Sequence, residues 1–95
     1  MILPKAKGWD EFLKLCHEAS SVSQLNELFD LLFTLEEKEQ LAMRVRLVKE
    51  LLKGEKTQRE MAHDLNVSIA KITRGSNALK TADSELKAYI SQLLN

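Results

Sequence analysis

Apolar residues recur at intervals of three and four along most of this chain, which is the spacing of one face of an α-helix. One such stripe passes through Trp9 and Cys16, and a second covers residues 22–32. The next stretch carries two neighbouring apolar rows as far as Lys53 and Gly54, a favourable end for a helix. Two rows make a wide apolar face, so we expect this third helix to be buried on more than one side.

Polar residues mark where the helices begin. Ser or Thr followed three residues later by Glu or Gln is the spacing of a capping box, in which side chains bind the free N–H groups of a helix start. The three capping boxes are Ser21 with Gln24, Thr34 with Glu37, and Thr57 with Glu60. Beyond residue 57, apolar stripes separated by Asn66 and by residues 81–84 predict three further helices, the second capped by Ser68. The chain is therefore predicted to be all-α, with six helices and no strand.

Length and composition narrow the class of protein. The chain has 95 residues, and we expect residues 1–95 to form a single domain. About a third of the surface of a chain this size stays in water after folding, so a lone core is marginal and oligomerisation is a common remedy. Because Cys16 is the only cysteine, no intrachain disulfide or multi-cysteine metal site can form, and neither a metal nor a cofactor is predicted. Without a signal-peptide pattern or an apolar run of about 20 residues, we expect a soluble, cytoplasmic protein with no membrane contact.

A formal net charge of zero hides an uneven distribution of charge. Residues 1–43 hold four basic against eight acidic residues, whereas residues 44–95 hold ten basic against six acidic ones. A basic half joined to an acidic half favours a surface that faces a polyanion. A basic face that is merely solvated explains the same pattern equally well.

Residues 57–80 have the pattern of a helix-turn-helix: a short helix, a sharp turn at Asn66 and a second capped helix. Ala62 is small enough for two helix axes to cross closely. The outward positions are polar or basic, as they are where a second helix enters the major groove of DNA. An ordinary helical hairpin with a polar outer face remains the alternative. The residues expected to seal the small core are Met61, Leu65, Val67 and Ile72.

Gly75 lies inside the second helix of this pair, where glycine costs about 0.5–1 kcal/mol relative to alanine. A bare backbone at this position allows something to approach closely, and a ligand ring or a phosphate are the interpretations we favour. A glycine that is simply tolerated is the alternative.

Two strings make this region specific, namely MRVRLVKELLKGEKTQRE at 43–60 and IAKITRGSNALK at 69–80. With these motifs the chain resembles the tryptophan repressor family, in less detail over most of its remaining length. The resemblance implies an intertwined homodimer of six-helix subunits, each with a helix-turn-helix head at about 57–80. It also implies a transcriptional repressor in which L-tryptophan, as corepressor, shifts the population toward an arrangement of the heads that binds double-stranded operator DNA.

The resemblance also implies a tryptophan site. Arg44 and Arg74 would flank the indole ring, and Arg74 with Thr34 would hold the carboxylate. Gly75 would let the ring lie against the helix backbone. The family commonly has Ser where this chain has Ala78, whose methyl group accepts no hydrogen bond. The ammonium group would then be bound by backbone carbonyls alone or with water, and these carbonyls are those of Leu31 and Phe33.

For DNA, the resemblance implies contacts from both helices of the head. Arg59 would contact a base edge, with guanine as the favoured partner of its planar fork. Lys71 stands where other members often have Thr, which leaves the operator sequence open. The residues expected to face the groove are Ile69, Ala70, Lys71 and Thr73, and those expected at phosphates are Gln58, Asn77 and Lys80.

Three other functions compete with this interpretation. An enzyme is not predicted, because adjacent Cys16 and His17 do not face each other on a helix, and His63, expected at the surface like His17, lacks a paired carboxylate or phosphate-binding loop. A helical interaction protein without DNA contact is the second alternative. A repressor of the same fold that responds to another ligand or to none is the third. Trp9 is expected to pack in the core of the first helix.

Overall fold

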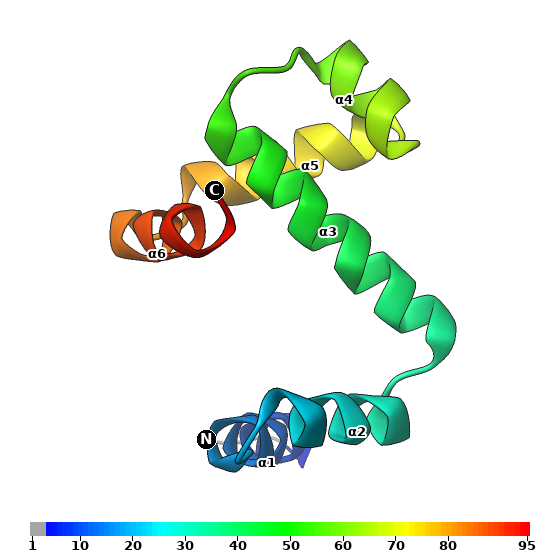
Figure 1. Ribbon diagram of the computed structural model, residues 1–95, viewed down its shortest axis with the longest axis vertical. Helices are drawn as coiled ribbons and strands as arrows, with labels where there is room; N and C mark the ends of the chain where they lie inside the picture. The colour runs from blue at the N-terminus through cyan, green and yellow to red at the C-terminus, as the bar shows by residue number, and fades with distance from the viewer. Residues whose placement is uncertain (1–3) are drawn as a thin grey trace. The chain divides into compact units, whose positions relative to one another are not determined.

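The computed structural model describes the backbone of residues 4–95 and the side chains of residues 7–95, and within this part of the chain every regular element is a helix (Figure 1). The predicted all-α class and the six predicted helices are confirmed. In chain order the helices are α1 (Pro4–Glu18), α2 (Val22–Leu32), α3 (Leu35–Lys53), α4 (Gln58–Leu65), α5 (Ile69–Lys80) and α6 (Ser84–Leu94).

The chain divides into two compact units at residue 38, which lies near the start of α3. The first unit contains α1, α2 and the first residues of α3. The second contains the rest of α3 with α4, α5 and α6. Each unit has its own set of contacts and is described by itself.

Two of the three predicted capping boxes are complete. At the start of α3, Thr34 Oγ1 accepts a hydrogen bond from the Glu37 N–H (3.1 Å), and Glu37 Oε1 accepts one from the Thr34 N–H (2.9 Å). Thr57 and Glu60 make the same pair of bonds at α4, both at 3.1 Å. Each box satisfies two N–H groups that a helix start leaves free.

The third predicted box, at α2, is only half right. Ser21 Oγ accepts from the Gln24 N–H at 3.0 Å, as expected. The Gln24 side chain instead accepts from the backbone N–H (2.6 Å) and the hydroxyl (2.9 Å) of Ser20. The reciprocal bond is therefore displaced by one residue, from the Ser21 N–H to the N–H and hydroxyl of Ser20.

The turn between α4 and α5 has the geometry that the sequence predicts. Asn66 adopts a left-handed conformation (φ 54°, ψ 49°) and ends α4, and the Val67 N–H donates to the Ala62 carbonyl at 3.2 Å. Ser68 then caps α5 by accepting from the Lys71 N–H at 3.2 Å. The helix-turn-helix arrangement therefore follows from one left-handed residue and one capping hydroxyl.

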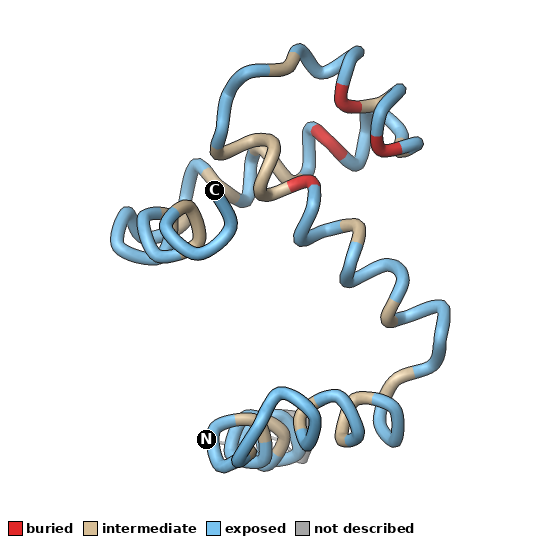
Figure 2. Tube along the Cα trace, in the orientation of Figure 1, coloured by how far each residue is buried: buried red, intermediate tan, exposed pale blue. Residues whose placement is uncertain are grey.

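The core of the second unit holds these two helices against α3. Its buried side chains are Met61 and Leu65 of α4, Ile72 of α5 and Leu47 of α3 (Figure 2). Ile72 is 0% exposed. The predicted core residues Met61, Leu65 and Ile72 are confirmed as buried, and Val67 packs against them while partly exposed. The contribution of Leu47 shows that the core belongs to α3 as much as to the helix-turn-helix.

The two apolar rows of α3 are covered to different degrees within the second unit. Met43, Leu47 and Leu51 lie in or against the core of the second unit. On the neighbouring row, Leu41 and Val45 are 42% and 45% exposed. Leu41 and Val45 therefore have little cover among the described residues of the second unit, whereas Val48 and Leu52 further along the same row are half-buried.

Three phenylalanines pack α1 against α2 in the first unit. The ring of Phe12 lies edge-on to that of Phe33 with centroids 5.8 Å apart, and Phe29 and Phe33 are similarly arranged at 5.4 Å. Edge-to-face packing is a favoured geometry of aromatic pairs. Asp30 of α2 and Lys38, in the first residues of α3, form an ion pair within the first unit.

The expectation that Trp9 packs in a core is wrong for the single chain. Its ring contacts that of Phe12, with centroids 5.2 Å apart, but the residue is 59% exposed. The apolar stripe of α1 meets α2 through Phe12, and no described element of the first unit covers Trp9 on its other side.

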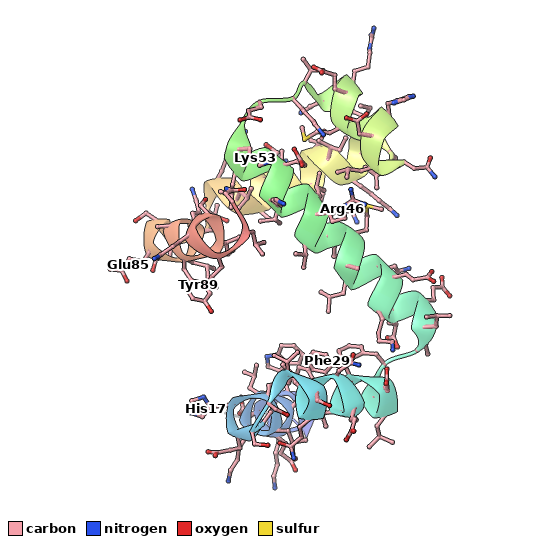
Figure 3. All side chains as sticks on the ribbon, viewed as in Figure 1. His17, Phe29, Arg46, Lys53, Glu85 and Tyr89 are labelled. Carbon is pink, nitrogen blue, oxygen red and sulfur yellow. The ribbon has the colours of Figure 1, made fainter. Side chains whose placement is uncertain are left out.

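Apolar residues are also exposed on α6. Tyr89 projects from this helix and is exposed, as are Leu86 and Leu93 (Figure 3). None of the helices within residues 4–95 combines the length and the apolar character needed to cross a lipid bilayer.

Candidate nucleic-acid interface and ligand site

Helix α5 has a buried stripe and a broad exposed surface. Ile72 is buried, and Gly75, Ser76 and Leu79 are half-buried at the spacing of one helix face. The remaining positions of α5 are all exposed. Every side chain of this helix that was expected to meet DNA is therefore at the surface: Ile69, Ala70, Lys71, Thr73, Asn77 and Lys80.

The side chains in the N-terminal turn of α5 form no ion pair with any residue that the structure describes. Ile69 is 47% exposed although it is a large apolar residue, and Ala70 and Lys71 beside it are exposed as well. Ser68 fixes the direction of this turn through its bond to the Lys71 N–H. An apolar and a basic side chain that project together can meet a thymine methyl group and a base or phosphate acceptor.

Helix α4 places two more predicted DNA residues at the surface. Gln58 and Arg59 are exposed in its first turn. The capping box of Thr57 and Glu60 surrounds them in sequence and occupies one oxygen of Glu60. Arg59 therefore extends from a fixed helix start, with its guanidinium free of any ion pair among the described residues.

Lys56 joins the loop before α4 to two helices. Its Nζ lies 3.1 Å from Asp64 Oδ2 on α4 and 3.7 Å from Glu50 Oε2 on α3. The hydrogen bond with Asp64 raises the pKa of Lys56, and the bond from Lys56, with a smaller contribution from His63, lowers the pKa of Asp64. This trio holds α4 to α3 at the surface. Sequence reasoning missed it, because the three residues belong to different elements and follow no helical spacing.

The remaining charge of the helix-turn-helix is positive. Residues 56–80 hold five basic and two acidic residues, and both acids already have partners: Asp64 pairs with Lys56, and Glu60 accepts the Thr57 N–H. The basic residues of the outer surface have no carboxylate partner among the described residues. The surface formed by α4 and α5 therefore suits a polyanion.

The residues expected to bind tryptophan are divided between the two units. Leu31 and Phe33 lie at the C-terminal end of α2, where the last carbonyls of a helix lack intrahelical partners. Thr34 Oγ1 accepts from Glu37, which leaves the hydroxyl hydrogen able to donate to a carboxylate. These three residues belong to the first unit. The second unit holds Arg44 on α3 and Arg74, Gly75 and Ala78 on α5.

Both arginines of this set are exposed, and so is Ala78. Arg74 and Ala78 are four residues apart on α5, so they lie on one flank of the helix. Ala78 presents only a methyl group, and no side-chain acceptor takes the place of a hydroxyl at that position.

Gly75 has a neighbour that the sequence did not reveal. A Cβ at this position would lie 3.0 Å from Leu47 Cδ2 and 3.4 Å from Leu51 Cδ1. The close approach inferred from this glycine therefore exists within the chain, between α5 and α3. It needs neither a ligand nor a phosphate, although it excludes neither from the adjoining flank.

The family model of the Trp repressor protein matches residues 7–94, which include both units and the helix-turn-helix. The chain belongs to the Trp repressor family. Proteins named Trp operon repressor homolog are similar to it over almost their whole length. That of Chlamydia trachomatis serovar L2 is 44% identical over 85 residues, which cover 90% of each chain.

Members of the Trp repressor family in other bacteria show the same degree of similarity. The homolog of Vibrio vulnificus strain YJ016 is 43% identical over 91 residues, covering 96% of this chain and 89% of the relative. That of Vibrio cholerae serotype O1 is also 43% identical over 91 residues, covering 96% and 88%. The family likeness therefore extends over nearly all of this chain, α1 and α6 included.

The side chains considered for enzyme chemistry show no catalytic arrangement in the described part of the chain. His17 and His63 are exposed as expected, and Cys16 is half-buried on α1. His63 lies 3.3 Å from Asp64, but both are exposed and Asp64 is paired with Lys56. The family that matches is named for a repressor, which is a regulatory protein.

Proposed function

We propose that this protein is a tryptophan-dependent repressor that binds operator DNA as a homodimer. The observation that carries the proposal is the exposed first turn of α5, where Ile69, Ala70 and Lys71 project from a capped helix. The opposite face of α5 packs against α3 and α4. In helix-turn-helix repressors, the Trp repressor among them, this turn lies in the major groove. The names of the relatives support the same function.

The apolar surface of the chain supports the homodimer. Leu41 and Val45 of α3 are exposed, together with Trp9 of α1 and Tyr89 of α6. Exposed apolar residues on this many helices are unusual for a monomer, and a second copy would bury them in a shared core. A dimer would also present two reading helices to two half-sites.

The proposed tryptophan site uses residues of both subunits. Leu31, Phe33 and Thr34 at the end of α2 would bind the ammonium and carboxylate groups, next to the α5 helix of the partner subunit. Arg74 would pair with the carboxylate, and Arg44 and Arg74 would flank the indole ring, since guanidinium groups favour both contacts. The ligand would favour the spacing of the two heads that fits DNA, and by linkage DNA would raise the affinity for tryptophan by the same factor.

A calorimetric titration with L-tryptophan tests this site, and the RVR motif supplies a matched pair of variants. Arg44 and Arg46 are both exposed on α3 but two positions apart, so they point to different sides of the helix. Arg44→Ala is expected to lower the affinity by about threefold to thirtyfold, the range of a stacked guanidinium. Arg46→Ala should leave it unchanged. Equal affinities for both variants would refute the assignment.

Arg74→Ala tests the carboxylate contact in the same titration. Loss of a hydrogen bond to a charged group costs about 1.5–3 kcal/mol, so the affinity should fall by at least about tenfold. Tryptamine, which lacks the carboxylate, should lose less affinity in the same variant, because only the contact of Arg74 with the indole ring is removed. An equal loss with tryptamine would show that Arg74 does not act on the carboxylate.

DNA binding is tested with duplexes enriched from a random-sequence library by the full-length protein. The wild type is expected to retard them in a gel at low salt only when L-tryptophan is present. If the protein retards no duplex, the result would favour a helical interaction protein without DNA contact. Equal retardation with and without tryptophan would favour the second candidate, a repressor of the same fold that responds to another ligand or to none. The missing acceptor at Ala78 is the observation that keeps this candidate open.

The variant Val45→Glu tests the oligomeric state. Because Val45 is exposed in the single chain, the substitution should leave the fold of the subunit intact. Sedimentation should show a dimer for the wild type and a shift toward monomer for the variant. A charged residue buried in a dimer core lacks a partner, which disfavours association. Lys53→Glu, on the same helix but at its exposed end, serves as the control that stays dimeric.

A further inference from the structure

The exposed residues of α5 fall on two flanks of the helix, one on either side of the buried stripe. The buried stripe consists of Ile72, Gly75, Ser76 and Leu79. With 3.6 residues per turn, the flank next to Gly75 carries Lys71, Arg74 and Ala78. The flank next to Ser76 carries Ile69, Thr73 and Lys80.

Lys71 has a position that no other residue of α5 shares. Around the helix it lies on the flank of Arg74 and Ala78, the two side chains proposed to meet the ligand. Along the helix it lies in the first turn with Ile69 and Ala70, the end proposed to meet DNA. Its backbone N–H is held by Ser68, so the Cα is fixed while the side chain is exposed.

The positive charge of Lys71 is not compensated in the free protein. Lys71 and Arg74 are three residues apart, where like charges on a helix repel. Neither forms an ion pair within the part of the chain that the structure describes. The nearby acids of the head are engaged elsewhere, Asp64 by Lys56 and Glu60 by its capping box. The pair is therefore suited to anions that arrive from outside.

We infer that Lys71 couples the two binding events: its ammonium group contacts the duplex strongly only when tryptophan occupies the flank of Arg74 and Ala78. This rests on the proposed function. A ligand carboxylate on Arg74 neutralises the charge that repels Lys71. An indole ring on the same flank packs against the four-carbon stem of Lys71 and restricts it to conformations that extend toward the DNA. Without the ligand, the side chain samples many rotamers, and its contact with DNA is weak.

The inference differs from a plain electrostatic contact in what it predicts for two lysines. Lys80 is also exposed, but it lies on the other flank and at the far end of α5. A lysine that merely meets a phosphate lowers affinity equally with and without ligand when it is removed. Removal of Lys71 must lower affinity mainly in the presence of ligand.

The experiment measures duplex affinity by fluorescence anisotropy for the full-length wild type, Lys71→Met and Lys80→Met, without L-tryptophan and at a concentration shown by titration to saturate each variant. The duplex is one enriched from a random library by the wild type. The gain in affinity on adding tryptophan should fall about tenfold in Lys71→Met. The gain should stay the same in Lys80→Met, because the duplex affinity of this variant falls by the same factor with and without tryptophan. Lys71→Arg should restore most of the gain.

Each outcome has a defined meaning. An equal loss with and without tryptophan in Lys71→Met would overturn the coupling role and leave Lys71 a plain DNA contact. No loss in either condition would overturn it as well. A wild type that binds no duplex, or binds equally with and without tryptophan, would instead refute the proposed function. Circular dichroism of each variant confirms that the helices are intact, as expected for substitutions at exposed positions.

Discussion

Gly75 of α5 lies directly against Leu47 of α3, so that a Cβ at position 75 would be 3.0 Å from Leu47 Cδ2. That distance is shorter than carbon atoms in contact normally keep. Leu47 is buried and surrounded by the core of the second unit, so it has little room to move. The absence of a side chain at Gly75 thus sets how closely the proposed reading helix packs on α3.

Gly75→Ala is expected to destabilise the protein by about 1 kcal/mol. Alanine gains about 0.5–1 kcal/mol of helix propensity over glycine, but an added methyl in a packed contact costs about 1–3 kcal/mol. Leu47→Ala removes the opposing methyl groups. In that background, Gly75→Ala should be harmless or favourable. Urea unfolding of both single variants and the double variant, at one protein concentration, measures this interaction. Additive effects within about 0.5 kcal/mol would mean that the two residues do not constrain each other.

Two isoleucines three residues apart on α5 separate stability from recognition. Ile72 is 0% exposed and Ile69 is 47% exposed. Ile72→Ala should cost about 2–5 kcal/mol, because it removes a fully buried side chain from the core that joins three helices. Ile69→Ala should change stability by less than about 0.5 kcal/mol, as surface substitutions usually do.

The same two variants give opposite results on DNA. At a temperature where both are folded, Ile69→Ala should weaken tryptophan-dependent binding to a selected duplex, with the largest loss where the duplex offers a thymine methyl group. Ile72→Ala should bind in proportion to its folded fraction. A stable Ile69→Ala variant with wild-type affinity would show that this residue does not face the groove.

Helix boundaries and caps were the part of the fold most accessible from sequence, because they depend on residues close in the chain. Thr57 with Glu60 and the left-handed Asn66 are local devices, and both occur as predicted. The displaced Gln24 bond was missed because Ser20 and Ser21 compete for one acceptor, and spacing alone does not rank them. Trp9 is exposed in the single chain, contrary to expectation, because an apolar stripe shows which face of a helix is apolar without showing what covers it.

The candidate site was less predictable for a related reason. Exposure of Lys71 and Lys80 on α5 follows from the helix period once Ile72 is placed inside, and that of Arg59 on α4 follows once Met61 and Leu65 are. The Lys56 contacts and the approach of Gly75 to Leu47 join segments that are distant in the sequence, so no local pattern encodes them. The same holds for the ligand residues, which belong to two units of the chain and, in our proposal, to two subunits.

Stability of the head should depend on pH through the pair formed by Lys56 and Asp64. The hydrogen bond from Lys56 lowers the pKa of Asp64 below its usual 3.8, so the carboxylate contributes stability above pH 3.8 and loses it as pH falls through the lowered pKa. The pKa of Lys56 is raised above 10.5, so its contribution is complete below that pH and is lost as pH rises through the raised value. The pair therefore stabilises the protein across the neutral range.

Asp64→Asn measures the acid side of this dependence. The variant should be less stable than the wild type at pH 7, and the difference should shrink as pH falls below 3.8. An NMR titration of the Asp64 carboxyl should give a pKa below 3.8 in the wild type and a higher one in Lys56→Met. A carboxyl that titrates at the same pH in both proteins would show that the ion pair does not persist in solution.

Ala78→Ser should increase how strongly the protein distinguishes L-tryptophan from indole-3-propionate, which lacks the ammonium group. In the proposed site Ala78 offers that group no acceptor, and the carbonyls of Leu31 and Phe33 bind it alone or with water. A hydroxyl at position 78 adds a hydrogen bond to a charged donor, which contributes about 1.5–3 kcal/mol, or less if it only replaces a water. The ratio of the two affinities, measured by calorimetry, should therefore rise about tenfold or more. The affinity for indole-3-propionate should barely change, because the substitution adds nothing near the ring or the carboxylate. A constant ratio would place the ammonium group away from position 78 and would remove the reason for expecting this chain to tolerate deaminated analogues.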